Sequence, residues 1–130
     1  MNKKRTVLIA EDEPDNREVI RSVVEDVGGY HALLAEDGEE ALRLAETELP
    51  DVALLDLLLP GLTGFEVTRR LKANPHTAHI PVIAITALGR SQDRAEALDA
   101  GAVGYVEKPF DVDSLLQKIG DVLHKHGDGR

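Results

Sequence analysis

Polar side chains that could do chemistry stand beside four short aliphatic runs that are far apart in the sequence. Glu11 and Asp12 follow the run at 6–10, Asp56 and Thr86 end the runs at 52–56 and 80–86, and Lys108 follows the run at 103–107. A carboxylate such as Asp56 is costly to bury inside an apolar segment unless a partner compensates its charge. The set therefore offers three carboxylates, one hydroxyl and one ammonium group.

These residue types favour phosphoryl chemistry with a divalent cation. Carboxylates about 4 Å apart repel by on the order of 4 kcal/mol per pair at an effective dielectric constant near 20, and a cation removes that penalty. Mg²⁺ takes one or two carboxylates and completes its shell with waters and phosphate oxygens. Lys108 and Thr86 can contact a phosphoryl group, and Asp56 can accept it as an acyl phosphate. Such transfer depends mainly on positioning and charge neutralisation, so a small site is sufficient.

The spacing of apolar residues predicts five strands that alternate with five helices. The expected strands are 6–10, 30–35, 52–56, 80–86 and 103–107. A first helix from Pro14 to the Gly28-Gly29 pair has apolar residues at helical spacing, namely Val19, Ile20, Val23, Val24 and Val27. The last helix, from about Asp111, is expected to turn six residues inward: Val112, Leu115, Leu116, Ile119, Val122 and Leu123.

Capping patterns set the starts of the other three helices. Asp37 with Glu40, and Thr63 with Glu66, fit the capping-box spacing, and Ser91 suits an N-cap position. The third helix should end near Ala73 and the fourth at Gly101.

Alternating strands and helices predict a parallel sheet with helices on both faces, and right-handed crossovers make this a doubly wound α/β domain. Ligands of such sheets bind beyond the carboxyl ends of the strands, which is where the polar residues stand. We expect one domain over residues 1–124 and a flexible tail at 125–130.

Composition excludes several classes of function. The 130 residues suit one domain, and a net charge of −9 argues against direct binding of nucleic acid or an anionic membrane. The absence of cysteine excludes disulfides and thiolate metal sites. No apolar run has the length of a membrane span, so we expect a cytoplasmic protein.

The motifs "LIAEDEP", "LLDLLLPGLTGFE", "PVIAITA" and "GAVGYVEKPF" resemble those of response-regulator receiver domains of two-component signalling, over residues 5–123. The resemblance implies a flavodoxin-like fold with strand order 2-1-3-4-5. It also implies that Asp56 is the phosphoacceptor, that Thr86 and Lys108 contact the phosphoryl group, and that Mg²⁺ is bound by Glu11, Asp12, Asp56 and the backbone carbonyl of Leu58.

The same resemblance implies a switch in which Thr86 moves toward the phosphoryl group and Tyr105 turns inward, although Tyr105 also suits a packing role in a strand. It further implies a cis peptide bond between Lys108 and Pro109. Leu58 and a second leucine, Leu88, stand where family members influence attack by water on the acyl phosphate. We expect two leucines there to slow hydrolysis.

The resemblance implies partners on both sides of the signal. A histidine kinase or histidine phosphotransfer protein would donate the phosphoryl group, and a downstream target would read the surface of the fourth helix, fifth strand and fifth helix. The chain would be a monomer or a phosphorylation-dependent dimer. It would catalyse only its own phosphorylation and slow dephosphorylation, and so would not be an enzyme in the ordinary sense.

Two other functions remain open at this point. A small Mg²⁺-dependent phosphatase of the haloacid dehalogenase class also uses an aspartyl phosphate, but its nucleophile follows the first strand and a second aspartate follows two residues later. Here Asp12 is followed by Glu13 and Pro14. A pseudo-receiver that only binds partners would not need all five site residues. A nucleotide-binding module is weaker still, because no glycine-rich loop follows the first strand.

Overall fold

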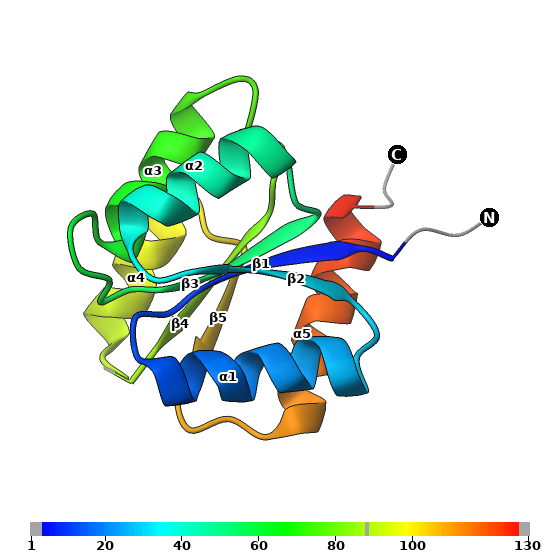
Figure 1. Ribbon diagram of the computed structural model, residues 1–130. Helices are drawn as coiled ribbons and strands as arrows, with labels where there is room; N and C mark the ends of the chain where they lie inside the picture. The colour runs from blue at the N-terminus through cyan, green and yellow to red at the C-terminus, as the bar shows by residue number, and fades with distance from the viewer. Residues whose placement is uncertain (1–3, 88, 128–130) are drawn as a thin grey trace.

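The computed structural model describes residues 4–87 and 89–127. Within them, five parallel strands form one sheet in the order β2-β1-β3-β4-β5, which confirms the predicted α/β fold (Figure 1). The strands are β1 (Thr6–Ala10), β2 (His31–Ala35), β3 (Val52–Asp56), β4 (Val82–Thr86) and β5 (Gly104–Glu107).

Helices cover both faces of this sheet. They are α1 (Pro14–Ser22), α2 (Gly38–Glu48), α3 (Gly64–Ala73), α4 (Ser91–Ala100) and α5 (Val112–Val122). Two π-helical turns, η1 (Val23–Val27) and η2 (Leu123–Gly127), extend α1 and α5. In Figure 1, α1 and α5 lie on one face of the sheet, and α2, α3 and α4 lie on the other.

The central strand β3 shows why an uninterrupted aliphatic run belongs in this sheet. All five of its residues are buried. Val52 and Leu54 pack on the α1–α5 side, whereas Ala53 and Leu55 pack on the α2–α4 side. Both faces of the strand are therefore apolar, and its last residue, Asp56, is left at the carboxyl edge.

The helix caps follow the predictions in part. Thr63 and Glu66 form a complete capping box at the start of α3. Asp37 caps α2, but the Glu40 carboxylate accepts a hydrogen bond from the backbone of Glu36, one residue before the expected N–H. The prediction for Ser91 is wrong. It is the first helical residue of α4, and the N-cap is the preceding residue, which caps without a side-chain hydrogen bond.

The end of the first helix differs from the prediction because its winding widens. The Gly28 N–H bonds the carbonyl of Val23, five residues back, which is the hydrogen bond of a π-helix. The Tyr30 N–H bonds the carbonyl of Val24. Tyr30 is therefore held by this turn, and β2 begins one residue later, at His31.

Three residues that the helical spacing placed among the core positions are exposed. Val19 is 55% exposed, Val27 61% and Val112 40%. Val112 opens α5, before the helix has packed against the sheet, and Val27 closes the π-helical turn. The other apolar positions predicted for α5 are buried or half-buried.

The backbone remains helical through Gly127, three residues beyond the predicted domain end at 124. Residues 128–130 lie outside the described residues, so the flexible tail stays a prediction. Among the described residues, no helix combines the length and the apolar character needed to cross a membrane.

Candidate functional site

Residues from four strand ends meet at the carboxyl edge of the sheet. The Lys108 Nζ, at the end of β5, donates to Glu11 Oε1 at 2.6 Å and to Asp56 Oδ2 at 2.7 Å. These partners are 97 and 52 residues away in the sequence. The parallel sheet thus brings the acid after β1 and the acid at the end of β3 to one ammonium group.

The backbone fixes where Lys108 enters the site. Its N–H donates to the carbonyl of Thr86 at 2.9 Å, so the end of β5 is bonded to the end of β4. Thr86 is fully buried. The Lys108–Pro109 peptide bond is cis, as the sequence resemblance implied.

Asp56 is held by its own turn and by the close approach of α3. It is 6% exposed, and its Oδ1 accepts a hydrogen bond from the Leu58 N–H at 2.8 Å. The Gly64 N–H donates to the carbonyl of Leu57 at 3.1 Å, and a Cβ at position 64 would clash with the Asp56 carbonyl oxygen. Glycine is therefore needed here for the first turn of α3 to lie against the loop that follows Asp56.

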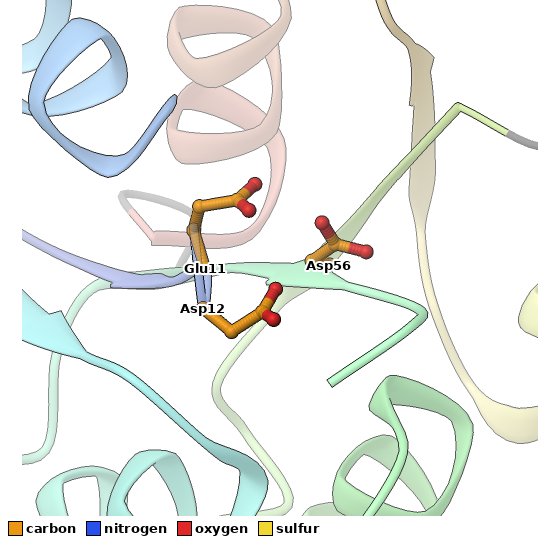
Figure 2. A group of neighbouring side chains, drawn as sticks. All are labelled: Glu11, Asp12 and Asp56. Atoms are coloured by element: carbon orange, nitrogen blue, oxygen red, sulfur yellow. The ribbon is translucent and has the colours of Figure 1, made fainter. Parts of the chain in front are cut away.

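The two neighbouring acids after β1 point in different directions (Figure 2). The Asp12 carboxylate turns toward Asp56 and is exposed to solvent. The Glu11 carboxylate is 3% exposed and turns away from Asp12; besides Lys108, it accepts a hydrogen bond from the Glu13 N–H at 3.2 Å. Within this pair, Asp12 is the acid that solvent reaches.

Burial and charge shift two pKa values in this cluster. Burial raises the pKa of Glu11 above its usual value, the Lys108 hydrogen bond opposes that rise, and Asp56 adds to it. Burial alone would lower the pKa of Lys108, but the hydrogen bonds to Asp56 and Glu11 outweigh it and raise that pKa. Lys108 is therefore charged at neutral pH.

The three acids can offer oxygen ligands to one cation. One carboxylate oxygen from each of Glu11, Asp12 and Asp56 lies within 4.8 Å of the others. Opposite ligands of one Mg²⁺ lie about 4.2 Å apart, twice the usual Mg–O distance. The cluster therefore fits Mg²⁺ with a small closing movement, or with a water between one acid and the ion.

Tyr105 is already turned inward. It is 9% exposed, it packs within the core on the α2–α4 side, and its hydroxyl has no hydrogen-bond partner among the described residues. The Arg94 guanidinium lies 5.3 Å from the centre of its ring. Burial and then the nearby Glu107 carboxylate raise the pKa of Tyr105. Its role in a switch stays a prediction.

The structure also shows what the sequence left open. Arg17 donates a hydrogen bond to the backbone of the loop that carries Glu11 and Asp12. Nothing in the sequence indicated this contact beyond the position of Arg17 in the first turns of α1. Leu58 is 56% exposed beside the site, and its carbonyl as a metal ligand stays a prediction. Leu88, the second leucine expected to slow hydrolysis, lies outside the described residues.

Residues 7–120 match the response regulator receiver domain. The chain belongs to this family. Protein PilH of Pseudomonas aeruginosa is 38% identical to it over 117 residues, which are 90% of this chain and 96% of PilH. The phosphate regulon transcriptional regulatory protein PhoB of the same organism is 38% identical over 125 residues, 96% of this chain but 54% of PhoB. The chain thus spans about half the length of several transcriptional regulators it matches.

A solved structure links the family to a metal. The receiver domain of sensor histidine kinase PA1611 from Pseudomonas aeruginosa, with a magnesium ion coordinated in its active-site cleft, superposes with a TM-score of 0.84. It is 35% identical to this chain, and the match covers 96% of this chain and 99% of that domain. The present chain has three neighbouring carboxylates of the kind Mg²⁺ requires.

Proposed function

We propose that this receiver domain accepts a phosphoryl group on Asp56 and passes the signal to a partner protein. One observation carries the proposal. The Asp56 carboxylate is bonded to the Lys108 ammonium group at 2.7 Å, beside the acid pair and the end of β4. The Asp56 carboxylate, the Lys108 ammonium group and the acid pair therefore lie within one site, although they come from separate parts of the chain.

The transfer proposed is a displacement at phosphorus. An Asp56 oxygen attacks the phosphorus of a phosphohistidine, the P–N bond breaks, and the imidazole leaves with the bonding electron pair and takes up a proton. Lys108 and Thr86 would bind the phosphoryl oxygens and hold the group in line. When bound, Mg²⁺ supplies positive charge against the phosphoryl oxygens, and Asp12, Asp56 and the Leu58 carbonyl would hold it, with Glu11 reaching it through water.

We propose a histidine kinase or a histidine phosphotransfer protein as the donor. The output would pass to a target protein through the surface of α4, β5 and α5. Thr86 and Tyr105 lie on the two strands that lead to this surface. Phosphorylation can shift that surface only as far as its contacts differ between the two states. The chain itself would contact no nucleic acid or membrane, would act in the cytoplasm, and would be a monomer or dimerise on phosphorylation.

The chain would catalyse only its own phosphorylation and slow dephosphorylation. A phosphatase would release phosphate from small esters many times per chain, whereas a receiver takes up one phosphoryl group and loses it slowly. Family membership over residues 7–120 favours the receiver. Repeated release of phosphate from small esters would instead favour the phosphatase.

Intact mass spectrometry tests the phosphoacceptor. The chain is incubated with Mg²⁺ and a small-molecule phosphodonor such as acetyl phosphate, and we expect the mass of one phosphoryl group to be added. Asp56→Asn should remain unmodified, and so should the wild type in EDTA. Asp51→Asn, at the opposite edge of the sheet, is the matched control and should be modified like the wild type. Equal modification of Asp56→Asn would refute Asp56 as the acceptor, and no modification of the wild type would favour the pseudo-receiver.

A further inference from the structure

Arg17 on α1 binds the backbone of the loop that carries the acidic pair. Its Nη1 donates to the Glu11 carbonyl at 2.9 Å and to the Asp12 carbonyl at 3.4 Å. Its Nη2 lies 3.7 Å from a Glu36 carboxylate oxygen, and its side chain is 16% exposed. We infer that Arg17 is a positioning residue that orients Glu11 and Asp12 and so sets the affinity of the site for Mg²⁺. The inference rests on the Mg²⁺ site of the proposed function.

Holding these two carbonyls orients the peptide planes on which both acids are carried. The Asp12 carboxylate then turns toward Asp56 (Figure 2), and the Glu11 carboxylate accepts the hydrogen bond from Lys108. Without the Arg17 hydrogen bonds, rotation of these planes would move the exposed Asp12 carboxylate away from Asp56. A preset geometry matters here because Mg²⁺ demands near-octahedral coordination at short distances.

Arg17 joins three segments at this edge. Its backbone N–H bonds the carbonyl of Glu13 at 2.9 Å, which starts α1. Its guanidinium reaches the loop after β1 and, through Glu36, the loop after β2. The planar guanidinium has several donors in a fixed fork, whereas a lysine ammonium is a compact point charge on a flexible stem. Lysine at this position would keep the charge, but its single nitrogen would not reach the two carbonyls and Glu36 together as Nη1 and Nη2 do.

Charge and position predict opposite effects when Arg17 is removed. Arg17 carries a positive charge close to the three carboxylates and the ammonium group of the site. This charge repels a cation and so opposes its entry. If Arg17 acted only through its charge, Arg17→Ala would bind Mg²⁺ more tightly than the wild type. If Arg17 positions the acidic loop, Arg17→Ala binds Mg²⁺ more weakly despite the loss of the opposing charge.

A Mg²⁺ titration without any phosphodonor separates these roles. Binding is followed by the backbone amide NMR signals of residues 11–13 and by calorimetry. We expect the dissociation constant for Mg²⁺ to rise about tenfold in Arg17→Ala, the scale typical of residues that orient metal ligands. The dissociation constant of Arg17→Lys should lie between those of the wild type and Arg17→Ala. Arg21→Ala removes the same charge from the same helix, and within the described part of the chain the ion pairs of Arg21 are with Glu18, Glu25 and Asp26, so this variant should bind Mg²⁺ like the wild type.

Each outcome decides something. Unchanged or tighter binding by Arg17→Ala, with normal saturation of the wild type, overturns the inference and leaves the proposed function intact. The same holds if Arg17→Ala loses thermal stability in EDTA while its Mg²⁺ affinity stays unchanged, since the role is then only structural. If Arg17→Ala does not fold, Arg17→Lys decides alone, because a charge role predicts wild-type affinity and positioning predicts weaker binding. No saturable Mg²⁺ binding by the wild type would overturn both the metal site and this inference.

Discussion

The two edges of the sheet use charged side chains in different ways. At the amino edge, the charged side chains of Asp51 and Lys72 are bound to backbone. The Asp51 carboxylate accepts a hydrogen bond from the Thr6 N–H at 2.7 Å, and the half-buried Lys72 donates to the carbonyls of Ala78 and Ile80. These bonds join the segments that enter β1, β3 and β4, so they stabilise the fold.

At the carboxyl edge, Asp56 and Glu11 also accept backbone hydrogen bonds, but here charged side chains face one another as well. Glu11, Asp12 and Asp56 lie together, and one ammonium group, from Lys108, contacts two of them. An excess of like charge in a partly buried cluster destabilises the folded state. The difference teaches that backbone hydrogen bonds hold charged side chains at both edges, whereas a surplus of like charges that face one another marks a site that a ligand completes.

The largest expected effect is at the amino edge. Lys72→Met keeps most of the side-chain volume but leaves the Ala78 and Ile80 carbonyls without their donor, so the free energy of unfolding should fall by about 2 kcal/mol. Burial lowers the pKa of Lys72, but the amine retains its role as donor to both carbonyls. Urea denaturation measures the change. Arg70→Met, at an exposed position of the same helix, is the control and should change little; equal losses in both variants would contradict the comparison.

A second amino-edge variant should have a smaller effect of the same sign. Asp51→Ala removes the acceptor for the Thr6 N–H, and we expect a loss of about 1.5 kcal/mol in the free energy of unfolding. Asp51→Asn keeps an amide oxygen near that N–H and should lose clearly less. If the two variants are equally stable, the hydrogen bond contributes nothing and the charge alone matters.

At the carboxyl edge the sign should reverse. In EDTA, Asp56→Asn should be more stable than the wild type by about 1 kcal/mol, because Lys108 keeps its contact with Glu11 and the relief of repulsion among the acids exceeds the loss of the Lys108–Asp56 ion pair. Mg²⁺ should stabilise the wild type by mass action and reduce or reverse this difference. Differential scanning calorimetry tests both effects. Glu46→Gln, an exposed neutralisation on α2, should change neither; a lower stability of Asp56→Asn in EDTA would contradict the proposed repulsion.

The sequence predicted the fold and the meeting of Glu11, Asp56 and Lys108 because both depend on strong local patterns. Aliphatic runs define the strands, and a parallel sheet must place their carboxyl ends at one edge. The gathering of Asp56 and Lys108 follows from that topology alone. The cis bond before Pro109 and the strand order came from the resemblance to receiver domains, since spacing alone cannot distinguish the alternatives.

Helix caps apart, contacts between a side chain and the backbone could not be predicted in the same way. The hydrogen bonds of Arg17 depend on how the loop after β1 folds back on α1, and residue spacing does not predict the course of that loop. The exposure of Val19 has a related cause. Periodicity marks it as one of several apolar positions, but α1 packs Ile20 into the core and leaves Val19 to solvent. The N-cap of α4 is Arg90, although Ser91, one position later, is the residue type that favours a cap.

The smallest expected effect extends the amino-edge pattern to β2 and depends on pH. The Glu25 carboxylate accepts a hydrogen bond from the Ala32 N–H at 3.0 Å and pairs with Arg21 at 2.8 Å, and these contacts, the backbone bond first, lower the pKa of Glu25 below 4.5. A pKa lowered by folding contributes stability that is complete above the unfolded-state pKa and is lost as pH falls through the folded-state pKa. Glu25→Gln should therefore reduce the free energy of unfolding by about 0.5 kcal/mol at pH 7, and the difference should vanish at pH well below 4.5.

Chemical denaturation across this pH range tests the prediction. Glu18→Gln is the matched control, because Glu18 also pairs with Arg21 but has no bond to a strand. Its effect should be smaller than that of Glu25→Gln at neutral pH. If the two variants behave alike, the stability comes from the exposed ion pairs of α1, and the bond to β2 adds nothing. If the Glu25→Gln difference persists in acid, the lost interaction does not involve the ionised carboxylate, and Glu25 does not belong with Asp51 among the charges that anchor the amino edge.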